Sequence, residues 1–109
     1  MEINICKEFS DTPNARYKSE GPFSGEEFRE NLLEPRYLEA KEKGEKLTIN
    51  MDGGYGYPTS FLEEAFGGLA RKYDPNEVLQ MLIFISDDEP SLIEEIESYI
   101  KNANRRGAK

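Results

Sequence analysis

Two hydroxyl side chains, Thr59 and Ser60, follow a glycine-rich loop in the middle of the chain. The loop, residues 53–58, reads GGYGYP and comes directly after an alternating apolar pattern. A hydroxyl in the first turn of a helix lies among unpaired backbone N–H groups at the positive end of the helix dipole. Such a hydroxyl can cap the helix, meet a phosphate or accept a phosphoryl group, and the sequence leaves all three uses open.

Ser60 and Glu63 have the spacing of a capping box, in which each side chain accepts a hydrogen bond from the backbone near the other residue. Most capping boxes are purely structural. Phosphorylation of Ser60 would instead add a charge of about −1.5 to −2 beside Glu63 and Glu64. The residue would then act as a switch for any surface that docks there.

The same region carries candidates for contact with a partner protein. Exposed tyrosines are frequent anchors of interfaces, and glycines inside a helix either allow close packing or offer a partner a flat surface. The partner-binding candidates are Tyr55, Tyr57, Phe61, Glu64, Gly67 and Gly68.

An alternative use of the loop is a small-ligand site for a phosphate, a nucleotide or another anion. The candidate residues are Gly53, Gly54 and Gly56, together with the cations Arg16 and Lys18. The loop lacks the lysine of the G-x-x-x-x-G-K-[ST] motif, and its glycines do not match G-x-G-x-x-G. An anion site here would therefore rest on backbone N–H groups and not on a nucleotide motif.

The composition bounds the chemistry of the chain. Histidine is absent from the 109 residues and Cys6 is the single cysteine. These counts remove the commonest general base, a zinc site, an internal disulfide and a Cys-His or Ser-His nucleophile. We therefore expect a protein that is not an enzyme and that has no metal and no cofactor.

The formal charge of −8 limits the classes of partner that the protein is expected to bind. Nucleic acids and anionic membranes attract positive surfaces, so a protein or a small ligand is the expected partner, and an acidic inhibitor of a basic protein is a third interpretation. The N-terminus has neither a basic start nor an apolar signal region, and the longest apolar run, residues 81–85, is far shorter than the roughly 20 residues of a membrane span. We expect a cytoplasmic protein.

About four strands are predicted. Residues 1–5 and 47–51 alternate between apolar and polar side chains, as half-buried strands do. Residues 78–85 are almost wholly apolar, which is typical of a strand covered on both faces in the middle of a parallel sheet. Residues 16–19 are a candidate short strand that closes a hairpin with the turn at residues 11–14.

About three helices are predicted between these strands. The first begins at Ser24, is kinked or interrupted by Pro35, and ends at Gly44. The second spans residues 60–73 and the third residues 90–103, each with apolar side chains at spacings of three and four. The alternation of strands and helices predicts an α/β fold in a single domain, residues 1–109, with a frayed tail at residues 103–109.

Three segments carry a resemblance to a known family: GPFSGEEFR at residues 21–29, LTINMD at residues 47–52 and, above all, TSFLEEAFGGL at residues 59–69. They resemble the STAS-like domains of unknown function found in prokaryotes, which are similar to sulfate-transporter and anti-sigma-factor-antagonist (STAS) domains. The resemblance covers roughly residues 1–75. It implies a STAS-like fold with a mostly parallel or mixed sheet.

In anti-sigma-factor antagonists, a serine or threonine at the start of the helix after a central strand is phosphorylated by a partner kinase of the histidine-kinase-like ATPase fold. Phosphorylation controls binding to that partner. By position, the resemblance assigns this role to Ser60, with Thr59 next to it. It implies a non-enzymatic regulatory module that docks an ATPase or kinase-like protein through residues 53–68.

Overall fold

The computed structural model describes residues 1–107, within which three parallel strands form one sheet. The strands, in spatial order, are β1 (Glu2–Asn4), β2 (Leu47–Asn50) and β3 (Leu82–Ile85). In register, Ile3 lies beside Ile49, and Ile49 lies beside Phe84. The α/β class is confirmed, but within the described residues the sheet has three strands, not about four, and all of them are parallel.

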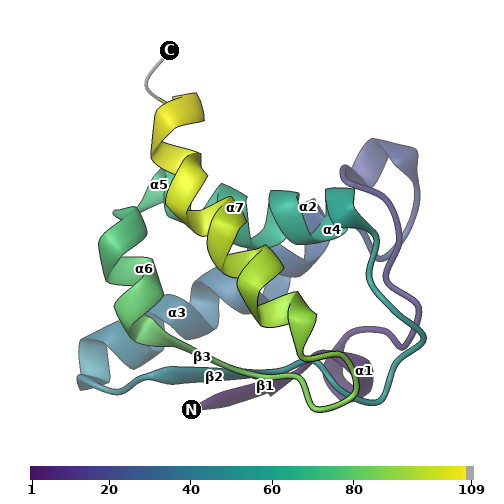
Figure 1. Ribbon diagram of the computed structural model, residues 1–109, viewed down its shortest axis with the longest axis horizontal. Helices are drawn as coiled ribbons and strands as arrows, with labels where there is room; N and C mark the ends of the chain where they lie inside the picture. Colours follow the sequence, from purple (N-terminus) through teal and green to yellow (C-terminus); the bar gives the residue numbers. More distant parts are fainter. Residues whose placement is uncertain (108–109) are drawn as a thin grey trace.

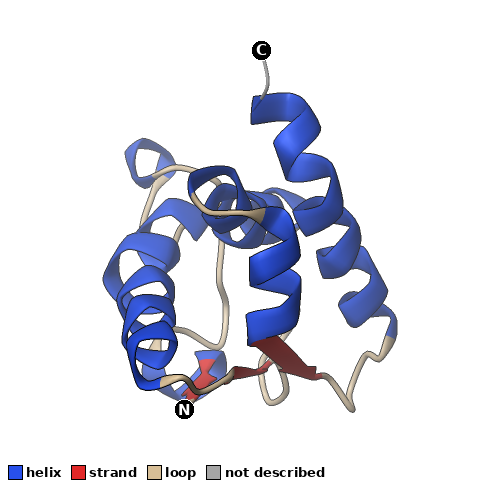
Figure 2. Ribbon diagram, turned by 90° about the vertical axis from the view of Figure 1, so that its left-hand side faces the viewer, coloured by secondary structure: helices blue, strands red, loops and turns tan. Residues whose placement is uncertain are grey.

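Strand β2 lies in the centre of the sheet, where we had expected the strand of residues 78–85. Leu47 and Ile49 are fully buried while Thr48 between them is partly exposed, because the long helices lie on one side of the sheet (Figures 1 and 2). Strand β3 instead forms an edge, and Ile83 on its far face is 45 % exposed. The sheet is therefore covered on one face by the helical layer.

The described residues contain five continuous helical segments instead of three. They are α1 (Ile5–Glu8); α2 (Gly25–Phe28), continued by the π-helical turn η2 (Arg29–Leu33) and α3 (Glu34–Lys43); α4 (Thr59–Leu62), continued by the π-helical turn η3 (Glu63–Gly67) and α5 (Gly68–Lys72); α6 (Pro75–Met81); and α7 (Ser91–Gly107). The two segments that the sequence did not predict are the short helices α1 and α6.

Helix α6 occupies the first half of the apolar run that we predicted to be a strand. The carboxylate of Asp74 caps the helix by accepting a hydrogen bond from the backbone N–H of Glu77 at 3.0 Å, and Pro75 takes the first helical position. An apolar run of this length fits a buried helix as well as a buried strand. The cap at Asp74 decides between them, and the strand begins only at Leu82.

Pro35 does not interrupt its helix. The π-helical turn η2 immediately precedes it, with the N–H of Glu34 bonded to the carbonyl of Arg29. The wider turn accommodates the proline, which has no N–H to donate. The helix starts at Ser24, whose hydroxyl accepts from the N–H of Glu27 as predicted, and it stops at Gly44 with φ of +69°.

The segment before this helix is not a hairpin. In place of the predicted strand at residues 16–19, the chain forms a short 3-10 turn, η1 (Lys18–Glu20). The carboxylate of Glu20 accepts hydrogen bonds from the N–H groups of Arg16 and Tyr17, so side-chain bonds replace the strand pairing that we expected. Hydrogen bonds from the backbone N–H groups of Gly25 and Glu26 to the carbonyls of Ala15 and Arg16 also join the segment to the start of α2.

Helix α7 packs its predicted stripe onto the rest of the helical layer. Leu92, Ile96, Ile100 and Ala103 are all buried. The helix continues to Gly107, beyond the point at which we expected the tail to fray, and residues 108 and 109 lie outside the described residues. Within the described part, no helix is both long enough and apolar enough to cross a membrane.

Candidate functional site

The loop that follows β2, residues 51–58, is fixed by contacts with the N-terminal part of the chain. The thiol of Cys6 donates to the carbonyl oxygen of Gly53 at 3.2 Å, and the N–H of Tyr55 donates to the carbonyl oxygen of Asp11 at 2.9 Å. Gly53 has φ of +97°, a conformation that residues with side chains rarely adopt. The loop therefore has a defined shape, and glycine is required at this position.

A second loop, which joins β3 to α7, is tied to the first by hydrogen bonds. The carboxylate of Asp52 accepts from the backbone N–H groups of Asp87 at 3.1 Å and Asp88 at 2.9 Å. In return, the N–H of Gly53 donates to the carboxylate of Asp88 at 3.1 Å. The two loops thus meet outside the carboxyl ends of β2 and β3, where α/β sheets usually bind their ligands.

A cavity of about 130 Å³ lies between these loops. Met51 and Leu92, both buried, line its inner part, and the exposed Asp88 and Glu89 line the part near solvent. Tyr57 also lines it, and burial raises the pKa of this tyrosine, whose hydroxyl donates to the carbonyl of Met51 at 2.8 Å. No lysine or arginine is among the described residues of the lining, so the cavity is acidic.

The helix after the loop begins at Thr59, with Pro58 in the capping position, so the predicted capping box does not form. Thr59 is exposed and Ser60, in the second helical position, is partly exposed. Glu63 does not return to the helix start, because its carboxylate is bound to arginines. Residues three apart also lie on the same face of a helix, and the spacing of Ser60 and Glu63 reflects only that here.

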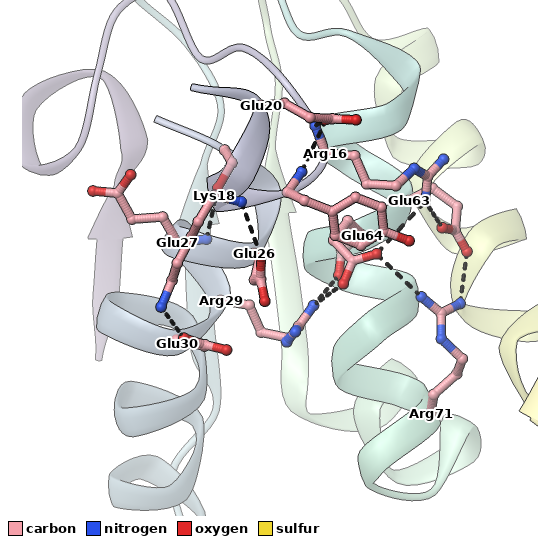
Figure 3. A network of polar contacts seen from close by, with 12 residues as sticks. Arg16, Lys18, Glu20, Glu26, Glu27, Arg29, Glu30, Glu63, Glu64 and Arg71 are labelled. Atoms are coloured by element: carbon pink, nitrogen blue, oxygen red, sulfur yellow. Dashed lines mark hydrogen bonds and ion pairs between the residues drawn. The ribbon is translucent and has the colours of Figure 1, made fainter. Parts of the chain in front are cut away.

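Glu63 and Glu64 form a buried ion network with three arginines (Figure 3). Arg16 and Arg71 bind Glu63, Arg71 at 2.7 Å, and Arg29 binds Glu64 at 2.7 Å. Glu63 and Glu64 are only 7 % and 8 % exposed, although we expected Glu63 to cap the helix and Glu64 to be available to a partner. A charged pair inside the apolar sequence FLEEAF was the signal that buried partners were needed.

The glycine pair Gly67-Gly68 lies in close contact with this network. A Cβ atom on Gly68 would lie 2.3 Å from Nη1 of Arg29, and one on Gly67 would lie 2.8 Å from a carboxylate oxygen of Glu63. Neither of our expectations, close packing on the sheet or a flat surface for a partner, describes this arrangement. Charged side chains of the same molecule lie over both glycines.

The structure separates the partner-binding candidates into two groups. Tyr55 is 84 % exposed and Tyr57 is partly exposed, so both reach the surface. The buried candidates are Phe61, Glu64, Gly67 and Gly68. Burial of the whole helix explains the difference, because every residue from 61 to 70 is buried.

Phe61 belongs instead to a row of aromatic rings beneath the loop. Its ring lies 6.0 Å from that of Tyr57 and 6.1 Å from that of Phe9, and the ring of Phe9 lies 5.6 Å from that of Phe23. Phe23 is 41 % exposed, and its φ is +61°. Phe23 was not among the surface residues that we expected from the sequence.

The cations proposed for an anion site lie elsewhere. Arg16 is bound to Glu63, and Lys18 forms an ion pair with Glu30. Burial acts to lower the pKa of Arg16, but the hydrogen bond and charge of Glu63 raise it above its usual value. With acidic residues lining the cavity beside Gly54 and Gly56, the geometry does not favour an anion there. The described residues also contain no group of three or more acidic or sulfur side chains that could hold a metal ion.

A family model described as a STAS-like domain of unknown function (DUF4325) matches residues 24–92, more than half of the chain. The chain belongs to this STAS-like family. It matches no curated protein and no solved structure at a significant level.

The matched part of this STAS-like domain contains most of the candidate site. It includes β2, both loops that line the cavity, Ser60 and the two buried glutamates. Strand β1, Cys6 and Arg16 precede it, although they complete the sheet, the loop and the ion network respectively. The N-terminal residues thus belong structurally to the site that the family region forms.

Proposed function

We propose that this STAS-like domain is a non-enzymatic regulatory module that docks a cytoplasmic protein of the histidine-kinase-like ATPase fold. One observation carries the proposal: Tyr55, which is 84 % exposed, lies on the fixed loop that leads directly into the helix starting with Thr59 and Ser60. A large, rigid and exposed aromatic side chain is a typical interface anchor. The resemblance to anti-sigma-factor antagonists supplies the class of partner.

The docking surface that we propose consists of Tyr55, Tyr57 and Phe23. Tyr57 and Phe23 are the two ends of the aromatic row, and its inner rings, Phe9 and Phe61, support them from below. Because the loop is held by Cys6 and Asp11, little conformational entropy is lost when a partner binds.

Ser60 is the residue through which we propose that docking is switched. Its side chain is accessible, and a phosphate there would accept hydrogen bonds from N–H groups of the first helical turn. It would also add a charge of about −1.5 to −2 at the start of the helix. A phosphate on Ser60 would repel an acidic partner surface and attract a basic one. Binding would then depend on whether Ser60 is phosphorylated.

The test is to incubate the protein with ATP and the purified ATPase encoded by a neighbouring gene, and to measure its mass. We expect an increase of one phosphoryl group that is lost in Ser60→Ala and retained in the matched variant Thr59→Ala. An unchanged mass, or an increase that persists in Ser60→Ala, would remove the switch from the proposal.

A further inference from the structure

The cavity between the two loops has a composition that the docking and switching roles leave unexplained. Its inner part is apolar, with Met51 and Leu92 only 3 % and 5 % exposed. Tyrosine side chains at Tyr55 and Tyr57 form further parts of the lining, and the carboxylates lie toward solvent. A gradient from apolar to acidic suits a ligand that is an alkyl chain at one end and a cation at the other.

The negative charge of the cavity favours a cationic ligand. Asp88 and Glu89 both line the cavity, and the carboxylate of Asp52 is bound to the backbone N–H groups of Asp87 and Asp88 in the same loop. One oxygen of Asp88 is bound to the N–H of Gly53, which fixes the direction of that carboxylate. Tyr55 adds an aromatic face, and such faces attract ammonium groups.

The size of the cavity suits a ligand no larger than a single amino-acid side chain. The volume of about 130 Å³ is close to that of a cavity of about 150 Å³ that admits benzene, a group of six heavy atoms. Pockets for nucleotides and other small-molecule ligands usually have about 300–1,000 Å³. A butylammonium group, with five heavy atoms, is of the right size, and it is the chemical equivalent of a lysine side chain.

We propose that this cavity receives the side chain of a lysine from the docked protein. Its methylene groups lie against Met51, Leu92 and the ring of Tyr57, and its ammonium group lies between the carboxylates of Asp88 and Glu89. This inference rests on the proposed function, since the lysine belongs to the partner. It names the chemistry by which the partner is recognised.

The pocket is tested first without any partner, by titrating the isotope-labelled protein with n-butylammonium and, separately, with n-butanol. We expect saturable shifts of the amide signals of Gly54, Gly56 and Ser86 with the amine and not with the alcohol. Glu89→Gln should weaken amine binding about fivefold, whereas Glu42→Gln, an equal loss of charge at an exposed position on α3, should leave it within twofold. The same spectra report whether each variant is folded.

Absence of saturable shifts, or equal weakening by the two variants, overturns the inference and leaves the docking surface at Tyr55 untouched. The source of the amine is tested by competition. If n-butylammonium displaces the neighbouring ATPase from the protein, the partner's lysine is the occupant. If the amine binds but the complex is unaffected, the assignment to a partner lysine is wrong and the ligand is a free alkylamine.

Discussion

At the scale of single residues, the most consequential group is the ion network around Glu63 and Glu64. Two carboxylates and the guanidinium group of Arg29 are largely removed from water, Arg16 and Arg71 remain partly exposed, and each carboxylate contacts more than one arginine. Such a network adds little net stability when complete, but it is costly to break because a buried charge is left without its partner. It also joins the N-terminal segment, through Arg16, to the helical layer.

We predict that Arg29→Ala destabilises the protein by about 3 kcal/mol, because Glu64 then lacks its closest cation. The side chains of this pair are only 12 % and 10 % exposed. The matched control is Lys18→Ala, whose ion pair with Glu30 has side chains 50 % and 41 % exposed and should contribute little to stability. Urea denaturation measures both, and equal losses would show that burial of the network has no energetic consequence.

At the scale of elements, the sequence predicted those features that depend on local pattern. The start at Ser24, the stop at Gly44, the strand that becomes β2 and the stripe of α7 all follow from capping chemistry or periodicity. The α/β class and the loop that carries Tyr55 follow from the same signals.

The remaining elements depend on contacts that no local pattern contains. The apolar run before β3 is divided by the cap at Asp74, and the helix through Pro35 survives because a π-helical turn precedes it. The site shows the same limit. Phe61 and Glu64, two of the partner-binding candidates, face inward, since partners far along the chain, Phe28 and Arg29, lie opposite them.

Helices α2 and α4 approach each other so closely that glycine is needed at Gly25, and this is the basis of a second prediction. A Cβ atom on Gly25 would lie 2.5 Å from the carbonyl oxygen of Phe61, a backbone atom that cannot move alone. We predict that Gly25→Ala destabilises the protein by about 1–3 kcal/mol, although alanine is the better helix former by about 1 kcal/mol. Asn31→Ala, at an exposed position of the same helix, should be neutral or slightly stabilising in thermal unfolding. A stabilising Gly25→Ala would contradict the close contact.

At the scale of the whole molecule, the residues that line the cavity gather at one end of the sheet. The helices cover one face, and both loops that line the cavity follow the carboxyl ends of their strands (Figure 1). Leu38, which is 44 % exposed, lies on α3, an element that contributes nothing to the cavity lining. A partner that docks as we propose therefore contacts the end of the molecule with Tyr55 and leaves α3 free.

The most direct test of this account is the affinity of the neighbouring ATPase for Tyr55→Ala and for Leu38→Ala, measured by calorimetry with the unmodified chain as reference. Truncation of an anchor at the centre of an interface usually costs more than 1 kcal/mol, and about 1.4 kcal/mol is a factor of ten in Kd. We predict that Tyr55→Ala weakens binding at least about tenfold and that Leu38→Ala leaves it within twofold. Unchanged binding by Tyr55→Ala, or an equal loss in Leu38→Ala, would contradict the proposed docking surface.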